Sequence, residues 1–473
     1  MSDGLPRLRF APSPTGFFHV GGARTALYNW LVAQRTGGTL VLRIEDTDTE
    51  RNQPEWVDGI QSAMQWVGAT WAEGPYFQSE RTALYSAACA RLVQQGNAYY
   101  CECTSAEVKA RNMDRLGAEG ERAGYDGHCR HLALGSEGRA LRFRSPSEGS
   151  TVVVDLIRGE PTFDNGLIED FVIQRANGGA MFILANVVDD IDMRISHVVR
   201  GEEHLSNTPK AILLWRALAP DVPLPVFAHV PVLVNEKRQK LSKRRDKVAV
   251  EEYRDMGILP EAMRNYLVLL GWAPGNDREV LTIGEMVAEF RLEDVNASPA
   301  MFDIVKLTAF NADYIRALPV DEFIHRCTPW LSSFDPVHFD AASFAVLAPM
   351  VQERARLLSD VPAMVDFLFC DQPVSDEASW EKAMASGPTG RQMLAGFADG
   401  VGNTSWDAAS LKALVEELGT TLGLKLGKAQ APIRVATMGR VVGLPLFESL
   451  ELLGRERTLH RIEAARARLS GAP

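Results

Sequence analysis

The stretch RFAPSPTGFFHVGG, residues 9–22, decides the fold because it joins two segments of different hydrophobic periodicity. The segment LRFA at 8–11 is typical of a short buried strand. From Gly22 onward apolar side chains recur at helical spacing until Gly37 and Gly38 supply a stop signal. A strand, a turn rich in glycine and proline, and a helix form the layout in which a helix N-terminus binds an anion. The stretch therefore predicts an anion-binding turn in an α/β fold, with an ordinary Gly/Pro turn and an incidental histidine as the alternative.

The rest of the first half alternates strands and helices. A strand at 39–46 is followed by helices at 53–68 and 79–96, the last after an expected Ser79 N-cap. This alternation predicts a Rossmann-type, doubly wound parallel sheet, interrupted by an inserted α+β domain and followed by an all-α C-terminal half. The expected segments are 1–98 and 191–255 for the two halves of the sheet domain, 99–190 for the insert, with a strand at 151–157, and 256–325 and 326–473 for two further domains.

Length, composition and net charge limit the number of domains, the location and the partners that we expect for this protein. A chain of 473 residues is expected to form about two to four domains. The N-terminus lacks the apolar segment of a signal peptide, and no apolar run is long enough for a membrane helix, so a cytoplasmic location is expected. The net charge of −11 argues against nucleic-acid binding as a whole-chain average, although a basic stripe on an acidic body is compatible with an RNA partner.

A basic loop, KRQKLSKRRDK at 237–247, contrasts with the acidic average. Such a run is usually a solvated face, but this one follows a strand of the resumed α/β pattern. We expect Lys240 and Lys243 to face the turn across the sheet, where His19 can donate hydrogen bonds to phosphate oxygens. Gly21 and Gly22 lack side chains, so a ligand can approach their amides closely.

A cysteine cluster in the expected insert is a candidate zinc site. Three thiolates and one imidazole make a tetrahedral zinc set, which here consists of Cys101, Cys103, Cys129 and His131. His128 is a rival for the imidazole ligand, and a set of reduced, partly buried cysteines is the alternative. Four protein ligands leave no open position, so a bound zinc would be structural. The six cysteines do not indicate a disulfide framework in a chain of this length.

Several motifs resemble the bacterial glutamyl-tRNA synthetases, a family of class I aminoacyl-tRNA synthetases. They are FAPSPTGFFHVGGARTALYNWL, LRIEDTD, VVRGEEHL, KLSKR and, near the C-terminus, GLPLFESLELLGRERTL. Residues 19–22 match the HIGH motif of the family and residues 240–244 its KMSKS loop. The resemblance implies that ATP, with Mg²⁺, activates L-glutamate as glutamyl-adenylate, and that the glutamyl group then passes to the terminal ribose of tRNA(Glu). Some members carry zinc at the cysteine positions, while others lack it.

The resemblance also implies roles for single residues. Phosphate stabilisation falls to His19, Lys240 and Lys243. The residues implied to bind ATP are Pro12, Gly16, His19, Gly21, Gly22 and Lys243. Those implied to bind glutamate are Arg9, Ser13, Glu45, Phe182, Asn186 and Arg200, with a structural ion pair as the alternative for Glu45 and Arg200 and a turn hydroxyl for Ser13. Phe182 stands where the family usually has Tyr, so one hydrogen bond to glutamate is expected to be lost or moved to another group.

An RNA partner is implied for much of the chain. The resemblance assigns the tRNA acceptor end to 99–190, the stem to 256–325 and the anticodon to 326–473. We expect a monomer that binds no membrane. An enzyme that also charges tRNA(Gln) stays open. So do a different nucleotidyl transferase, a shorter relative that glutamylates a modified tRNA base, a glutaminyl-tRNA synthetase and a non-catalytic tRNA-binding protein. The long helical half argues against the shorter relative, and the intact motif residues argue against a non-catalytic protein.

Overall fold

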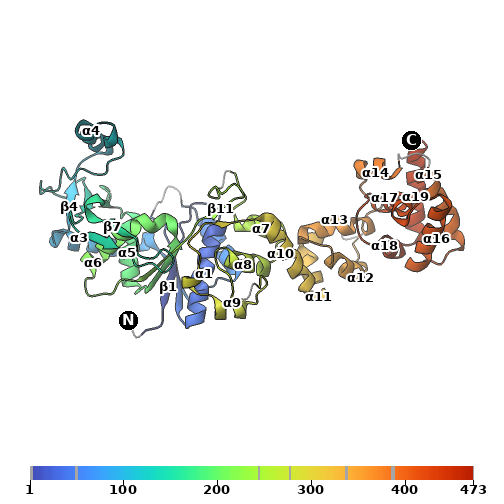
Figure 1. Ribbon diagram of the computed structural model, residues 1–473, viewed down its shortest axis with the longest axis horizontal. Helices are drawn as coiled ribbons and strands as arrows, with labels where there is room; N and C mark the ends of the chain where they lie inside the picture. Colours follow the sequence, from blue (N-terminus) through green and yellow to red (C-terminus); the bar gives the residue numbers. More distant parts are fainter. Residues whose placement is uncertain are drawn as a thin grey trace. The chain divides into compact units, whose positions relative to one another are not determined.

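The computed structural model describes residues 4–47, 52–242, 245–275, 278–335, 339–384 and 389–471 (Figure 1). The chain forms two compact units: unit 1 contains Met1–Arg254 and Pro260–Leu307, and unit 2 contains Asp255–Leu259 and Thr308–Pro473. The five segments expected from the sequence divide these units more finely and stay a prediction.

Unit 1 is built on a five-stranded parallel sheet in the order β10-β9-β1-β2-β3. The strands are β1 (Arg7–Phe10), β2 (Thr39–Ile44), β3 (Glu73–Phe77), β9 (His197–Gly201) and β10 (Val226–Val230). The chain leaves β1 in one direction through β2 and β3 and later fills the other side with β9 and β10. The strand order therefore reverses beside β1, and parallel sheets bind ligands at the carboxyl ends of the strands at such a point. The doubly wound fold is confirmed.

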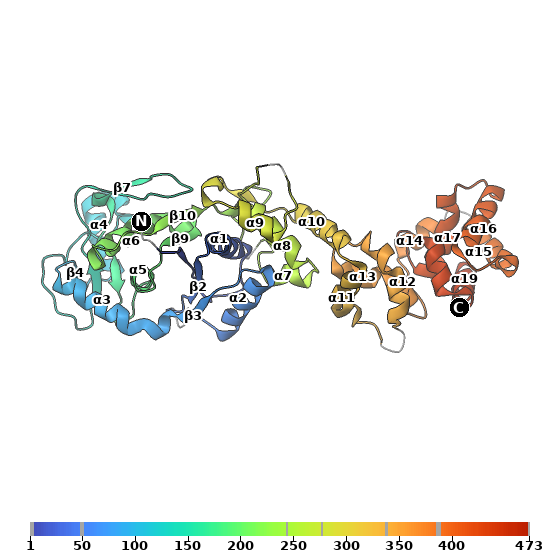
Figure 2. The ribbon, with the colours of Figure 1, turned by 90° about the horizontal axis from the view of Figure 1, so that it is seen from below.

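Helices cover both faces of this sheet. α1 (Val20–Thr36) lies on one face, and α5 (Phe182–Asp192) and α6 (Thr208–Leu218) lie on the other (Figure 2). Ile212 of α6 packs with Val41 of β2 and Phe227 of β10 in a buried cluster. α1 ends at Gly37, which has a left-handed φ of 66° and acts as the C-cap, as the stop signal predicts.

The helix expected to begin after Ser79 begins later. α2 (Pro54–Val67) agrees with the sequence, but α3 runs from Thr82 to Gln94 because Ser79 is engaged elsewhere. The backbone N–H and the hydroxyl of Ser79 donate to the Asp46 carboxylate at 2.8 and 2.6 Å. Ser79 therefore fixes the end of β3 to the loop after β2 and does not cap the helix.

The insert has the expected α+β character. Its antiparallel sheet has the order β4-β5-β8, and a separate hairpin is formed by β6 and β7. The strand expected at 151–157 ends early, because β6 stops at Val152 and the chain turns at Asp155 to pair with Phe227 of β10. The elements are β4 (Ala98–Cys101), α4 (Ser105–Leu116), β5 (Ala140–Phe143), β6 (Ser150–Val152), β7 (Thr162–Asp164) and β8 (Val172–Gln174).

Helices dominate the chain after the sheet domain. A short parallel pair, β11 (Leu233–Val234) with β12 (Ala300–Met301), joins the strand region to the helices α7 (Val250–Asp255), α8 (Pro260–Leu269), α9 (Ile283–Glu289) and α10 (Ile304–Ala317). Within the described residues, unit 2 contains helices and no strand, so the all-α half is confirmed. Its further helices are α11 (Val320–Leu331), α12 (Ala341–Gln352), α13 (Val361–Val365), α14 (Glu377–Met384), α15 (Thr389–Gly400), α16 (Ala408–Thr421), α17 (Leu426–Met438), α18 (Leu446–Leu453) and α19 (Arg455–Leu469). None of the described helices combines the length and the apolar character needed to cross a membrane.

Candidate active site

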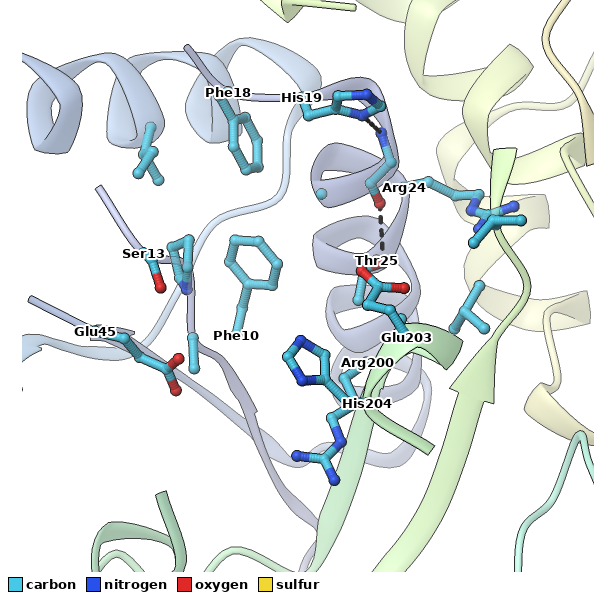
Figure 3. A pocket seen from close by; sticks show the side chains of 18 of the residues that line it. Phe10, Ser13, Phe18, His19, Arg24, Thr25, Glu45, Arg200, Glu203 and His204 are labelled. Atoms are coloured by element: carbon cyan, nitrogen blue, oxygen red, sulfur yellow. Dashed lines mark hydrogen bonds between the residues drawn. The ribbon is translucent and has the colours of Figure 1, made fainter. Parts of the chain in front are cut away.

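One pocket of unit 1 gathers most of the residues predicted to bind ATP and glutamate (Figure 3). This β1–β9 pocket has a volume of about 490 Å³ and lies where the strand order reverses, beside the start of α1. Lys243 and Arg244 of the basic loop lie outside the described residues. The predicted site residues that line the pocket are Arg9, Pro12, Ser13, Gly16, His19, Gly21, Gly22, Glu45, Phe182, Asn186, Arg200 and Lys240.

His19 is the N-cap of α1. Its Nδ1 accepts a hydrogen bond from the Gly21 amide at 2.9 Å, so a neutral imidazole carries its proton on Nε2. The peptide groups around it pair with the segment after the basic loop, through Val20 N to Val248 O at 2.8 Å and Val250 N to Phe18 O at 2.9 Å. The HVGG turn and the end of the basic loop are therefore held together by the backbone.

The turn between β1 and α1 depends on its glycines and its first proline. Gly16 has a φ of 146°, which L-residues with a side chain rarely adopt. The Pro12 carbonyl accepts from the Glu45 amide at 2.9 Å, which joins the turn to the end of β2. A Cβ on Gly22 would lie 2.9 Å from the Phe18 ring. The glycines thus permit both the path of the turn and the packing beneath it.

The basic loop reaches the pocket through Lys240 and Leu241. The Leu241 amide donates to the Leu233 carbonyl of β11 at 3.0 Å. Asp246 holds the other end of the loop, because its carboxylate accepts from the Ser242 amide at 3.0 Å and from Asn235 Nδ2 at 3.2 Å. These bonds, with the Ser242 amide first, lower the pKa of Asp246. The expected juxtaposition of the loop and the HVGG turn is therefore present.

Arg9 and Arg200 differ in their charge partners. Arg9 is buried, and its Nε donates to Asp190 Oδ1 at 3.2 Å. Arg200 donates instead to Thr208 Oγ1 at 2.8 Å and to His229 Nε2 at 3.3 Å. None of the described carboxylates lies within ion-pair distance of Arg200. Burial, together with the nearby Arg9, lowers the pKa of Arg200 to about 10. Arg200 is still a cation at neutral pH, and it lacks a carboxylate partner from the described chain.

A buried network that sequence reasoning missed lies behind Glu45 and Asn186. Arg43 of β2 is fully buried and donates to Asp190 Oδ1 and Asn186 Oδ1, both at 2.7 Å. Its guanidinium is 3.6 Å from Glu45 Oε1. Burial raises the pKa of Glu45, although the charge of Arg43 acts in the opposite direction. The signal in the sequence was a charged residue inside the otherwise apolar strand TLVLRI.

The aromatic side of the pocket contains a second missed residue, His204. Its imidazole stacks on the Phe182 ring with centroids 5.4 Å apart, and both line the pocket. Burial, followed by the charge of Arg200, lowers the pKa of His204 to about 4. A neutral imidazole therefore adjoins the position where the family pattern has a tyrosine hydroxyl.

The cysteine cluster is formed, but without the predicted imidazole. The Sγ atoms of Cys101, Cys103 and Cys129 lie within 4.8 Å of one another, as zinc ligands require. His131 is exposed and does not belong to this group, and the same holds for His128. The structure instead places the Tyr125 hydroxyl 3.4 Å from Cys101 Sγ, where it also accepts from the Cys129 amide at 2.7 Å. Tyr125 was not predicted, because a tyrosine four residues before a cysteine carries no familiar metal-site signal.

Known protein families match both units of the chain. The family model of the catalytic domain of tRNA synthetases class I (E and Q) matches residues 7–309, and the model of an anticodon binding domain matches residues 322–466. The glutamate–tRNA ligase of Salinispora arenicola is 59% identical over 98% of this chain and 99% of its own length. That of Thermobifida fusca is 55% identical over the whole of both chains.

A solved structure agrees with these relatives. The crystal structure of a glutamate tRNA ligase from Elizabethkingia meningosepticum in complex with its amino acid matches with a TM-score of 0.84 and 29% identity. The match covers 98% of this chain and 100% of that one. The chain therefore belongs to the class I tRNA synthetases of the E and Q group and, within them, to the family of glutamate–tRNA ligases.

Proposed function

We propose that the protein is an active glutamate–tRNA ligase, which activates L-glutamate with ATP and transfers it to the 3′-terminal ribose of tRNA(Glu). The observation that carries this proposal is the composition of the β1–β9 pocket. One end presents the amides at the start of α1 together with His19 and Lys240, and the other presents Arg200 without a carboxylate partner among the described residues. The first set suits phosphates and the second suits a carboxylate.

At the phosphate end, the residues stabilise charge and take no covalent part. An oxygen of the glutamate α-carboxylate attacks the α-phosphorus of ATP, and the bond to pyrophosphate breaks. His19 Nε2–H is positioned to donate to a phosphate oxygen, because Nδ1 is occupied by the Gly21 amide. Lys240 supplies a mobile positive charge from the loop, as the resemblance implies for Lys243. ATP brings Mg²⁺, which neutralises phosphate charge.

At the amino-acid end, charge selects the substrate. Arg200 offers a guanidinium to the side-chain carboxylate of glutamate, and a guanidinium binds a carboxylate through two parallel hydrogen bonds. Glu45, Ser13 and Asn186 line the same pocket and are proposed to hold the α-ammonium and backbone of the substrate. Arg9 contributes positive charge but shares it with Asp190. The missing hydroxyl at Phe182 leaves His204 as the polar group on that side.

The RNA substrate is proposed to use the insert at its acceptor end and unit 2 at its anticodon. The match of residues 322–466 to an anticodon binding domain supports the second assignment. In the transfer step the terminal ribose hydroxyl attacks the glutamyl carbonyl and AMP leaves.

Pyrophosphate exchange tests the proposal. With glutamate, ATP and tRNA(Glu), the wild type is expected to exchange pyrophosphate into ATP, and His19→Ala is expected to lower the rate by about 10²–10³-fold. Lys240→Ala should lower it as well, because both side chains face the phosphates. Lys237→Ala is the matched control, since Lys237 belongs to the same basic loop but does not line the pocket. Exchange that does not depend on glutamate, or whose rate is unchanged in both His19→Ala and Lys240→Ala, would contradict the proposal. Transfer of labelled glutamate to tRNA(Gln), measured as glutamyl-tRNA formed, reports whether a second tRNA is charged.

We also propose that Cys101, Cys103 and Cys129 bind a structural zinc ion. Metal analysis of the purified protein is expected to find about one zinc ion per chain, as for a single structural zinc site. Cys103→Ser should lose the zinc because one thiolate disappears. His131→Ala should retain it, because His131 lies outside the cluster, whereas Tyr125→Phe should weaken its retention against a chelator. A full loss of zinc in His131→Ala with full retention in Tyr125→Phe would show that His131, and not Tyr125, completes the site.

A further inference from the structure

Behind Arg200 lies a chain of buried hydrogen bonds that the proposed chemistry does not use directly. Asp155 comes from the insert and His229 from β10, and both side chains are completely buried. His229 Nδ1 lies 2.6 Å from Asp155 Oδ2, and His229 Nε2 lies 2.9 Å from the Thr208 hydroxyl. Asp155, His229 and Thr208 are called the Arg200 support below.

The carboxylate of Asp155 fixes the protonation of His229. Besides the imidazole, it accepts backbone N–H groups from Ile157 at 2.9 Å, Arg158 at 2.8 Å and His229 at 3.0 Å. A carboxylate that receives this many donors is an acceptor only, so Nδ1 of His229 must carry a proton. Burial lowers the pKa of His229, so the ring is neutral and its Nε2 presents a lone pair.

That lone pair faces both the Thr208 hydroxyl, at 2.9 Å, and one edge of the Arg200 guanidinium. Arg200 Nε is 3.3 Å from His229 Nε2, and Arg200 Nη2 donates to Thr208 Oγ1 at 2.8 Å. Its Nη1 has no hydrogen-bond partner among the described residues. Arg200 lines the β1–β9 pocket, where Figure 3 shows it beside His204. The contacts hold the guanidinium from behind and leave its remaining edge for a ligand.

The chemistry of these contacts also preserves the charge of Arg200. Arg9 is held by a carboxylate directly, which offsets its positive charge. Arg200 is held by an imidazole and a hydroxyl, both neutral. Asp155 is the one charged residue of the Arg200 support, and the imidazole ring of His229 separates it from Arg200. A guanidinium oriented by neutral acceptors keeps a strong preference for an anionic side chain over an uncharged amide.

We propose that Asp155, His229 and Thr208 are positioning residues that orient Arg200 without neutralising it and thereby set the preference for glutamate over glutamine. This inference rests on the proposed role of Arg200 in binding the substrate side chain. Because Asp155 belongs to the insert, a residue outside the sheet domain supports the amino-acid pocket.

Exchange kinetics of the full-length protein, measured with tRNA(Glu), test the proposal. Thr208→Val removes the hydroxyl and is expected to raise KM for glutamate about tenfold, the effect of losing a hydrogen bond to a charged group. Because Thr208 does not touch the phosphates, kcat and KM for ATP should stay within about twofold of wild type. Thr208→Ser restores the hydroxyl and should restore KM for glutamate. The ratio of kcat/KM for glutamate to that for glutamine should fall in Thr208→Val and recover in Thr208→Ser.

His229 gives a second, independent pair. His229→Leu removes the acceptor and should raise KM for glutamate, whereas His229→Gln places an amide oxygen near the position of Nε2 and should recover part of the affinity. Thr151→Val is the matched control, because Thr151 is a buried threonine of the insert whose hydroxyl donates to Asn165 Oδ1 at 2.6 Å, away from the pocket. It should leave both KM values unchanged. If thermal melting shows that His229→Leu is unfolded, the proposal is tested by Thr208→Val and Thr208→Ser alone.

The outcomes separate this inference from the proposed function. A wild type without glutamate-dependent exchange contradicts the proposed function. An active wild type whose KM for glutamate is the same in Thr208→Val overturns the inference alone. A rise in KM that Thr208→Ser does not reverse, or an equal rise in KM for ATP, also overturns it, because either result indicates general damage to the fold.

Discussion

At the scale of single residues, the environment separates arginines that the sequence treats alike. Arg9, Arg43 and Arg200 all come from strands of the same sheet. Arg43 is fully buried among carboxylates and is structural, Arg9 shares its charge with Asp190, and Arg200 contacts only uncharged acceptors among its hydrogen-bond partners. The positive charge available to a substrate is therefore greatest at Arg200.

Arg200→Gln tests this difference. Removing the guanidinium should raise KM for glutamate by about 10²-fold, since a charge-assisted, bidentate contact is lost. KM for glutamine should change far less, so the two amino acids should become similar substrates in the exchange assay. Arg216→Gln, at an exposed arginine on α6, should leave both constants unchanged. Equal losses for glutamate and glutamine would show that Arg200 does not read the charge of the side chain.

His204 makes stability depend on pH. Its pKa in the folded protein is about 4, because burial outweighs other effects, against an ordinary value of 6.5. The His204 side chain therefore binds a proton more readily in the unfolded state than in the folded state. The contribution of neutral His204 to the free energy of unfolding is complete above pH 6.5 and is lost as the pH falls toward 4. His204→Phe, which keeps a ring against Phe182, should lose less stability across this interval than the wild type. Urea unfolding at several pH values measures the difference, and parallel curves for the two proteins would contradict the assignment.

At the scale of elements, the start of α1 was predictable, and the long-range contacts around the pocket were not. Glycine and proline marked the turn, and helical spacing marked α1, because both signals are local in the sequence. Asp190 lies 147 positions from Arg43, and His229 lies 74 positions from Asp155, so neither contact leaves a periodic signal. Ser79 has the residue type of an N-cap, but its partner, Asp46, comes from a different strand end. Likewise, the family resemblance implies that Arg9 binds the substrate directly, and its ion pair with Asp190 could not be foreseen.

Gly22 offers a test at this scale. Gly22→Ala places a Cβ 2.9 Å from the buried Phe18 ring, and such overpacking typically costs about 1–3 kcal/mol of unfolding free energy. KM for ATP should rise as well, since the start of α1 must shift. Gly284→Ala in α9 is the matched control, because nothing lies within 4 Å of its added Cβ and alanine favours a helix. Denaturant unfolding should show a loss only for Gly22→Ala. Equal stability of both variants would show that Phe18 yields without cost.

At the scale of the whole molecule, an acidic chain has to bind a polyanion. The net charge is −11, yet the loop at 237–247 is strongly basic and borders the β1–β9 pocket. Each unit has its own buried core, with Leu27 and Tyr28 among the buried residues of unit 1 and Phe323 and Phe397 among those of unit 2. Local basic groups and not the overall charge therefore have to provide the RNA contacts.

Added salt should affect the binding of tRNA(Glu) and the binding of glutamate differently. The affinity for tRNA(Glu) should fall steeply with added NaCl, with a logarithmic slope of about −0.7 to −0.9 for each phosphate contact. KM for glutamate should change much less, because Arg200 acts over a short distance inside a pocket that screens it from bulk ions. Filter binding and exchange kinetics across the same salt series measure both. A flat response of tRNA binding would exclude phosphate contacts as its main source.

The backbone bond from Val20 N to Val248 O has a consequence for biosynthesis. The ribosome makes the HVGG turn more than two hundred residues before it makes the partner of that turn. A nascent chain stalled anywhere in the insert therefore lacks Val248, Lys240 and Arg200, and it cannot carry out the reaction however well its first strands have paired. Translation products that end within the insert are therefore inert, and activity requires that residues on both sides of the insert have been made and have come together.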